Sequence, residues 1–437
     1  MKFYNRKNEL ALLRQIEKQS KQSAEMTFVV GRRRIGKTSL LTKAYSSSNC
    51  LYFFVAKKNE ALLCQEFLEE IKQKLKVPIF GNIKTFREIF QFLMELSKNK
   101  NFSLVIDEFQ EFYTVNQSVF SDMQNIWDAN KQTSKINLIM CGSVYARVSR
   151  IFENSKEPLF GRATNRIHLK AFDIQSLKTV LNDYHPNYSS EDLLAFYLFT
   201  SGVPKYIELL VKKNATTLSS ILDEIFSENS ILLDEGKNVL IEEFGKEYAN
   251  YFSILSLIAS GKTSRVEIES ILEMQTGGFL DRLENDYGLI KKVRPIFSKP
   301  NSRRVKYSIE DNFLSFWFRF IYKYRSAIEH GNLDYVKTIV LRDYKTYSGK
   351  ILEKYFVQKL KAKKKFNLIG TYWDKSNHYE IDIVAVNDLE KKLLFAEVKR
   401  QKSNIKINTL KEKSQKLLPK FKDYDVVYKG FSLEDMG

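Results

Sequence analysis

The amino-acid sequence predicts an α/β protein whose N-terminal part is built on a parallel sheet. Between Met26 and about Ala171, short apolar runs (TFVV, LYFFVA, FSLVID and INLIMCGS) alternate with longer stretches of helical periodicity, as they do in parallel α/β sheets. The first run leads through a glycine-bounded loop into a helix, in MTFVVGRRRIGKTSLL, and the third run ends in two acidic residues. These observations predict a sheet with polar loops at the carboxyl ends of its strands.

Changes of pattern divide the chain into five segments. The parallel sheet takes up 1–171, and helix-period sequence over 172–246 predicts a helical lid. Three helices with turns between them and a two-stranded ribbon are expected over 247–312, an order that resembles a winged helix-turn-helix. An aromatic helix (FLSFWFRFIYKYR) opens a helical connector over 313–346, and a small α/β domain follows over 347–437.

Composition favours a polyanionic partner. The 437 residues include 70 Lys and Arg against 52 Asp and Glu, a net charge of +18, which suits a nucleic acid. A merely lysine-rich proteome is the open alternative. The three cysteines and four histidines show no disulfide or zinc spacing, and no apolar stretch is long enough to cross a bilayer. We therefore expect a cytoplasmic protein without a membrane segment.

The loop GRRRIGKT carries the pattern Gly-x4-Gly-Lys-Ser/Thr between a predicted strand and a helix. Backbone N–H groups of such a loop wrap phosphate oxygens, and the helix directs its positive dipole end toward them. Lys37 would reach the β- and γ-phosphates of ATP, and the Thr38 hydroxyl would enter the shell of a Mg²⁺ ion. The predicted nucleotide-binding residues are Gly31, Arg32, Arg33, Arg34, Ile35, Gly36, Lys37, Thr38 and Ser39.

Two further strand ends complete this predicted site. Asp107 closes the run SLVID and would hold Mg²⁺ through water, while Glu108 would orient and activate the attacking water. Ser143 ends the next run, INLIMCGS, and its hydroxyl would sense the γ-phosphate; a capped turn is the alternative for Ser143. The pair of acidic residues predicts ATP hydrolysis as well as binding.

The chain resembles the archaeal-type P-loop ATPases, a group related to AAA+ proteins, over nearly its whole length. The resemblance rests on FYNRKNEL near the N-terminus, EPLFGRAT, and TSGVPKY in the predicted lid. It implies that Arg162 is an arginine finger, acting within one subunit or across a homo-oligomer interface, although a plain ion pair is an equal alternative. Lys205 is a weaker phosphate-sensing candidate.

The C-terminal segment places charges in apolar strands. Asp382 interrupts EIDIVAV, and Glu397 and Lys399 lie two residues apart in KLLFAEVKR, hence on one face of a strand. This pattern resembles the PD-(D/E)xK nuclease superfamily, which implies that Asp382 and Glu397 hold Mg²⁺ while Lys399 positions the attacking water. By the same resemblance, Glu353 matches an additional acidic position. A strand pair with solvated ends, or an inactive nuclease fold that grips nucleic acid, is the alternative.

These features predict an ATPase that acts on nucleic acid, with DNA favoured, and that carries a magnesium-dependent nuclease-like domain. Residues 350–422 hold 19 basic and 8 acidic residues, which suits phosphate contacts in that domain. A basic group in the winged-helix segment, including Arg265 and Lys291, could read duplex DNA or serve a hinge or protein contact. Two other classes stay open: an ATP-regulated signalling or defence switch with a C-terminal effector, and a scaffold with an inactive nuclease fold.

Overall fold

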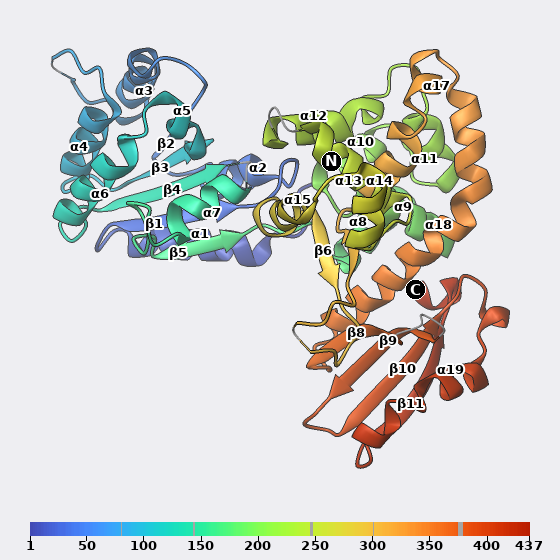
Figure 1. The fold of residues 1–437 in the computed structure, drawn as a ribbon. Helices are drawn as coiled ribbons and strands as arrows, with labels where there is room; N and C mark the ends of the chain where they lie inside the picture. Colours follow the sequence, from blue (N-terminus) through green and yellow to red (C-terminus); the bar gives the residue numbers. More distant parts are fainter. Residues whose placement is uncertain (80, 143–144, 245–247, 300, 375–378) are drawn as a thin grey trace. The chain divides into compact units, whose positions relative to one another are not determined.

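The structure is a computed structural model that describes residues 1–79, 81–142, 145–244, 248–299, 301–374 and 379–437. The chain forms two compact units (Figure 1), and the division falls between Ala171 and Phe172. The first unit is residues 4–171; the second is residues 172–437 together with residues 1–3. Each is described by itself below.

The first unit is a five-stranded sheet with helices on both faces. The strands, all parallel, lie in the order β2-β3-β4-β1-β5. The elements are α1 (Lys7–Gln19), β1 (Glu25–Val30), α2 (Lys37–Ala44), β2 (Cys50–Phe54), α3 (Glu60–Leu75), α4 (Phe86–Leu96), β3 (Phe102–Asp107), a 3-10 turn η1 (Phe109–Glu111), α5 (Phe112–Val115), α6 (Val119–Asn130), β4 (Ile136–Gly142), α7 (Tyr145–Glu153) and β5 (Asn165–His168).

Alternate residues of each strand pack into two cores. Met26, Phe28 and Val30 of β1 face the core under α3, α4, α6 and α7, whereas Val29 faces the core under α1 and α2, as the two-residue period of a strand requires. Strand β5 was not predicted from the sequence, because Ile167 is its only apolar residue. Pairing with β1 compensates for that weak local signal.

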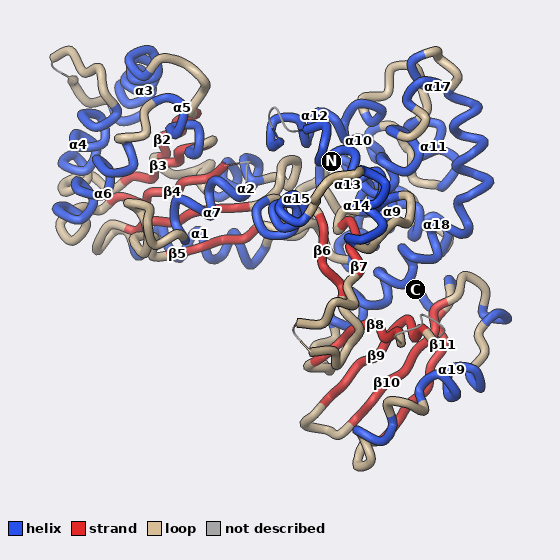
Figure 2. The backbone as a smooth tube through the Cα atoms, viewed as in Figure 1, coloured by secondary structure: helices blue, strands red, loops and turns tan. Residues whose placement is uncertain are grey.

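The second unit begins with a helical part (Figure 2). Its helices are α8 (Ile174–Tyr184), α9 (Ser190–Thr200), α10 (Pro204–Lys212), α11 (Leu218–Ile225) and α12 (Leu232–Phe244). Every residue of α9 from Leu193 to Thr200 is buried, so this helix forms the centre of the helical part. A capping box between Ser189 and Asp192 begins it.

Three helices and a ribbon follow in the order expected from the sequence: α13 (Tyr248–Ala259), α14 (Arg265–Leu272), α15 (Gly277–Asp281) with its π-helical continuation η3 (Arg282–Asp286), β6 (Ile290–Val293) and β7 (Lys306–Ile309). The strands β6 and β7 are antiparallel. The loop between them packs into the C-terminal sheet: the Ile296 amide donates to the Thr371 carbonyl at 2.8 Å, and Ile296 joins the core of that sheet. The ribbon and the C-terminal sheet are therefore fastened together.

The remaining elements are α16 (Asn312–Phe316), η4 (Trp317–Tyr322), α17 (Arg325–Glu329), α18 (Leu333–Ala362), β8 (Leu368–Trp373), β9 (Glu380–Asn387), β10 (Lys392–Val398), α19 (Ile407–Ser414) and β11 (Asp425–Phe431), with short 3-10 turns η5 (Lys402–Asn404), η6 (Leu418–Lys420) and η7 (Leu433–Met436). The sheet order is β11-β10-β9-β8, with β11 parallel to β10 and the other pairs antiparallel.

Helix α18 runs straight through the predicted boundary between the connector and the C-terminal domain. It covers 30 residues without a break, although the sequence pattern placed a boundary at 346/347. Gly349 lies inside it and lacks a close neighbour that a side chain would meet, so the helix tolerates this glycine. The finer division of the second unit into lid, winged helix and C-terminal domain stays a prediction.

Candidate nucleotide-binding and metal-binding sites

The glycine loop adopts a backbone that only some residues accept. Gly36 has φ +86° and precedes α2, and Arg34 also has positive φ, at 67°. A Cβ at Gly31 would lie 2.9 Å from the carbonyl oxygen of Leu169, a contact that real side chains avoid. The two glycines thus have different roles. Gly36 allows the left-handed turn into α2, and Gly31 allows the loop to approach the segment after β5.

Lys37 and Thr38 lie in the first turn of α2, as the motif predicts. The Lys37 ammonium is buried and donates to the carbonyl oxygens of Gly31, at 2.7 Å, and Arg32, at 3.2 Å. Burial lowers the pKa of Lys37, and nearby Cys141, Glu108 and Asp107 oppose that effect. A phosphate would replace the loop carbonyls as a stronger, charged partner of this ammonium.

Asp107 is the residue on which this site converges. Its Oδ2 accepts from the Thr38 hydroxyl at 3.3 Å and from the Tyr52 hydroxyl. Its Oδ1 accepts from the Cys141 thiol at 3.0 Å and from the Glu108 amide at 2.9 Å. Sequence analysis missed Tyr52 and Cys141, since both reach Asp107 only because β2 and β4 flank β3.

Strand β4 lies between β1 and β3, so the glycine loop and Asp107 sit on strands separated by one strand. Glu108 follows Asp107 with φ +53°, and its carboxylate accepts from the Gln110 side chain. A Cβ at Gly142 would overlap this same glutamine, so Gly142 leaves room for Gln110 at the end of β4. Ser143, the predicted γ-phosphate sensor, lies outside the described residues.

Arg6 binds the backbone of the glycine loop, a role that the sequence did not predict although the residue lies in the motif FYNRKNEL. It is 5% exposed, and its guanidinium donates to the carbonyl oxygens of Ile35, at 3.3 Å, and Lys170, at 2.6 Å. Glu9 pairs with the same guanidinium at 3.2 Å. Because one rigid guanidinium binds both carbonyl oxygens, it fixes the path of the glycine loop relative to the segment after β5. The signal in the sequence is the Arg and Glu of NRKNE.

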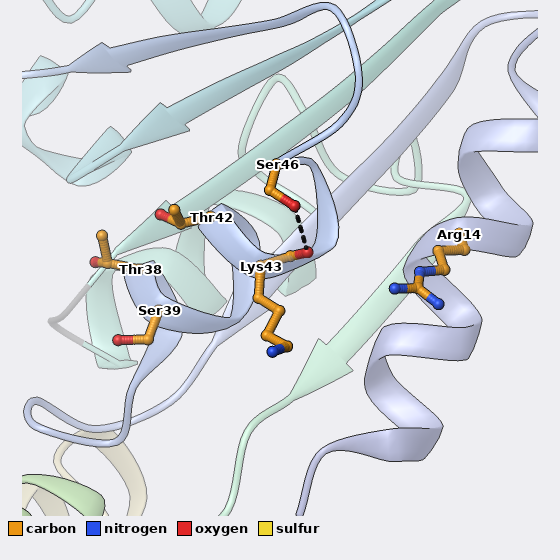
Figure 3. A pocket seen from close by; sticks show the side chains of 6 residues that line it. All are labelled: Arg14, Thr38, Ser39, Thr42, Lys43 and Ser46. Atoms are coloured by element: carbon orange, nitrogen blue, oxygen red, sulfur yellow. Dashed lines mark hydrogen bonds between the residues drawn. The ribbon is translucent and has the colours of Figure 1, made fainter. Parts of the chain in front are cut away.

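An open groove of about 580 Å³ runs along the exposed side of α2 (Figure 3). It starts at Thr38 and Ser39, and the other lining residues are Arg14, Thr42, Lys43 and Ser46. Hydroxyl groups and two cations therefore line the surface beside the loop. Ser39, a predicted nucleotide-binding residue, is exposed on this groove.

Arg162 is not near this site within its own subunit. Its Nε and Nη2 donate to Asp128 at 3.0 and 2.9 Å, and Asn165, which starts β5, pairs with Thr27 near the start of β1. The glycine loop begins four residues later along β1, about 13 Å at 3.3 Å per residue. Arg162 thus lies at the amino edge of the sheet, opposite the loop. Lys205 lies in the second unit and pairs with Glu208 at 3.6 Å.

Comparison with known proteins assigns the family. Residues 3–210 match a family described as an ATPase domain predominantly from Archaea. An uncharacterized protein of Methanocaldococcus jannaschii is 30% identical over 91% of this chain and 87% of its own length. The protein belongs to this family of archaeal P-loop ATPases. Residues 317–416 match a second family, described as archaeal and bacterial proteins of unknown function.

Solved structures agree with the fold of this ATPase. A Walker-type ATPase of Pyrococcus abyssi superposes with a TM-score of 0.54 at 17% identity, covering 72% of this chain and 96% of that one. The ORC2 protein of Aeropyrum pernix, solved in ADPNP and ADP complexes, gives a TM-score of 0.49 at 15% identity over 75% and 96% of the two chains. The Pyrococcus abyssi structure therefore confirms the α/β fold of the core with its parallel sheet, whereas the ATPase class rests on the family match.

The C-terminal charges predicted from the sequence also come together. Lys399 Nζ lies 3.4 Å from Glu397 Oε1 and 3.7 Å from Asp382 Oδ2. The Val398 amide donates to the same Asp382 oxygen at 2.7 Å. Lys413 of α19, which sequence analysis missed, lies 3.7 Å from Glu397 Oε1. Two carboxylates thus share the ammonium of Lys399.

Glu353 of α18 belongs to this group by its electrostatics. Burial, and next the Asp382 carboxylate, raise the pKa of Glu353 to about 8. Burial also raises the pKa of Asp382, against the opposing Val398 amide and Lys399. For Lys399, burial acts to lower the pKa, but Asp382 and Glu397 outweigh it and raise it. A site that makes its carboxylates hard to ionise favours a cation.

The two predicted winged-helix recognition helices do not carry a basic face. Residues 265–286 contain two basic and six acidic residues, and the ribbon loop is occupied by the C-terminal core through Ile296. Phosphate backbones attract positive surfaces, and the basic residues of this segment lie mostly outside these helices, as Lys291 does. Reading of duplex DNA by this segment stays a prediction. No helix in the described part of the chain is both long and apolar enough to cross a membrane.

Proposed function

We propose that this ATPase acts on DNA and that its C-terminal domain is a magnesium-dependent nuclease. The carrying observation is the convergence of Asp382, Glu397 and Lys399 from two neighbouring strands, with two distances below 4 Å. The alternative, a strand pair with solvated ends, does not explain these charges, because the side chains of Asp382 and Glu397 are largely removed from water.

Magnesium fits the donors of both sites. Mg²⁺ prefers oxygen ligands and keeps several waters; Thr38 and Asp107 would hold it in the ATPase site, and Asp382 and Glu397 in the C-terminal site. Among the described residues no group of three or more His, Cys, Asp or Glu side chains forms a ready cage. Two carboxylates with water and substrate oxygens are the expected ligand set.

The residues of each site then have distinct tasks. In the ATPase site, Lys37 binds phosphate oxygens and Glu108 holds the attacking water as general base. In the C-terminal site, bound Mg²⁺ would polarise a phosphate oxygen. Lys399 there orients a water against the phosphate, and Lys413 offers a second cation for phosphate charge. Arg162, facing away from its own loop, is proposed to serve a neighbouring subunit.

The test is Mg²⁺-dependent cleavage of labelled plasmid and linear DNA by the full chain, with and without ATP. We expect Asp382→Asn and Lys399→Ala to lose cleavage at least about 100-fold while retaining ATP hydrolysis. Glu390→Gln is the matched control, because Glu390 is an exposed carboxylate in the turn between the same two strands. Cleavage of RNA alone would overturn the choice of DNA, and no cleavage of either would overturn the nuclease.

A further inference from the structure

Arg400, the residue after Lys399, reaches away from the C-terminal site. Its Nη1 donates to the Ser348 hydroxyl of α18 at 2.6 Å, and its Nη2 pairs with Glu191 in the first turn of α9, 209 positions away in sequence. The guanidinium also lies 5.4 Å from the ring centroid of Tyr344. Its side chain is only 16% exposed.

These contacts join two elements that supply the C-terminal site. Helix α18 carries Ser348 and, five residues later, Glu353, while β10 ends beside Lys399. Burial, and next the Glu191 carboxylate, raise the pKa of the Tyr344 phenol, so Tyr344 lies in the same network. A rigid planar guanidinium with three partners fixes the spacing of the groups that it joins.

Helix α9 links this network to the place where the two compact units meet along the chain. Its 11 residues span about 16 Å at 1.5 Å each, and its core burial makes it a rigid rod. At its far end, the Phe172 amide donates to the Gly202 carbonyl at 2.7 Å. A Cβ at Gly202, where φ is +74°, would lie 2.3 Å from the Phe172 carbonyl oxygen.

The residues just before Phe172 contact the glycine loop within the first unit. Lys170 accepts from Arg6, which also holds Ile35, and the Leu169 carbonyl lies against Gly31. Contacts in the first unit therefore run from the glycine loop to Lys170, and the backbone at Ala171 joins this segment to Phe172. Within the second unit, contacts run from Phe172 along α9 to Glu191 and Arg400.

We propose that Arg400 is a positioning residue of the C-terminal site and that, through Glu191 and α9, it makes this site respond to ATP. The proposal rests on the nuclease function proposed above. Contiguous contacts alone do not establish coupling; coupling is a difference in free energy that both sites report. Its measure here is the ratio of cleavage rates with and without ATP at constant free Mg²⁺.

The experiment compares full-length wild type, Arg400→Gln, Arg400→Lys, Glu191→Gln and Arg325→Gln. Arg325 is the control because it too is a partly buried arginine paired with two carboxylates, Asp234 and Glu329, yet it contacts neither α9 nor β10 in those pairs. Circular dichroism checks folding. Mn²⁺ titration of nucleotide-free protein, with the Asp382→Asn signal subtracted, gives the affinity of the C-terminal site without reference to cleavage.

We expect Arg400→Gln to weaken Mn²⁺ binding by about 10-fold, because it frees the segment after Lys399 from the helix that carries Glu353; this is the lower end of what loss of a direct partner of a metal ligand costs. We also expect it to bring the ATP ratio to one. Arg400→Lys should restore part of the affinity. Glu191→Gln should bring the ratio to one with a smaller loss of Mn²⁺ affinity, because Ser348 still holds Arg400.

Two failures are distinguishable. If wild type binds Mn²⁺ and cleaves but the Arg400 and Glu191 variants match Arg325→Gln, or if wild type itself ignores ATP, this inference alone is overturned. If wild type neither binds Mn²⁺ at Asp382 nor cleaves, the proposed nuclease function fails first and the inference falls with it.

Discussion

The guanidinium of Arg6 donates a 2.6 Å hydrogen bond to the carbonyl oxygen of Lys170, across 164 positions of sequence. The same side chain holds the carbonyl of Ile35 inside the glycine loop. One buried arginine therefore sets the distance between the loop and the segment that follows β5. The loop is not held by its own glycines alone.

Replacing Arg6 should weaken nucleotide binding. Arg6→Ala leaves the buried carbonyl of Ile35 and the part-buried carbonyl of Lys170 without a charged donor, and each such bond contributes about 1.5–3 kcal/mol. We expect the unfolding free energy to fall by about 2–4 kcal/mol and the Kd for ATP to rise about 10-fold. Denaturant titration and fluorescent-nucleotide titration measure these. Arg87→Ala, at an exposed ion pair with Asp122, is the control; equal effects of both variants would contradict the role of Arg6.

Tyr52→Phe should change the Mg²⁺ requirement of ATP hydrolysis. The variant removes one of the four donors that orient Asp107. It keeps every carbon atom of the side chain, so the fold should persist. We expect the Mg²⁺ concentration for half-maximal hydrolysis to rise about 10-fold, the lower end of what loss of an outer partner costs. Tyr45→Phe removes a hydroxyl that contacts Asn137 instead and should leave the Mg²⁺ dependence unchanged. A shared change in both variants would sink the prediction.

Local sequence signals predicted much of the first site because its chemistry is concentrated in short segments. Gly31 to Thr38 and the pair Asp107 and Glu108 each stand at a strand end, and the parallel order of strands brings them together. Tyr52 and Cys141 gave no such signal. An aromatic residue and a cysteine inside strands are read as core, and only the pairing of β2, β3 and β4 brings them to Asp107.

Contacts between distant segments of the C-terminal site could not be predicted either, because they too arise only from the fold. Asp382, Glu397 and Lys399 were found because charges interrupt apolar strands, but Lys413 and Arg400 sit among many other lysines and arginines of residues 350–422. Lys413 lies on α19 and Glu191, the partner of Arg400, lies on α9; no local pattern assigns either helix to the site. The 30-residue α18 was likewise not predicted as one helix, because the sequence pattern changes near residue 346 while the helix continues through it.

Stability should depend on pH through Glu353. Its folded-state pKa, about 8, lies above the ordinary value, so the folded state retains a proton that the unfolded state has lost between about pH 4.5 and 8. The resulting stability is fully present below about pH 4.5 and is lost as pH rises to 8. In chelator, wild type should therefore lose stability relative to Glu353→Gln over this range. Parallel Tm curves for the two proteins would refute the shift.

The loop between β6 and β7 should be needed for the C-terminal sheet. Ile296 is 7% exposed and packs with Ile381, Val384 and Phe395. Ile296→Ala leaves a cavity, and we expect a loss of about 2–4 kcal/mol in unfolding free energy. Val266→Ala, at a site 77% exposed, should stay within about 0.5 kcal/mol of wild type. Denaturant titration decides; a small effect at Ile296 would mean that the loop does not support the sheet.

Arg162 should act only across a subunit interface. It is held by Asp128 at the edge of the sheet opposite the glycine loop, so its own nucleotide lies out of reach. Lys37→Ala lacks a working phosphate site but keeps Arg162. Arg162→Ala keeps the phosphate site but lacks the arginine. Each alone should hydrolyse ATP at least about 100-fold more slowly than wild type, since an arginine finger contributes about 10³–10⁵ in rate.

Mixing the two variants should restore turnover, because one subunit then supplies the arginine and the other supplies the phosphate site. Steady-state phosphate release at several protein concentrations measures this. A mixture no faster than Arg162→Ala alone, together with turnover per subunit that ignores concentration, would assign Arg162 to its ion pair with Asp128 only.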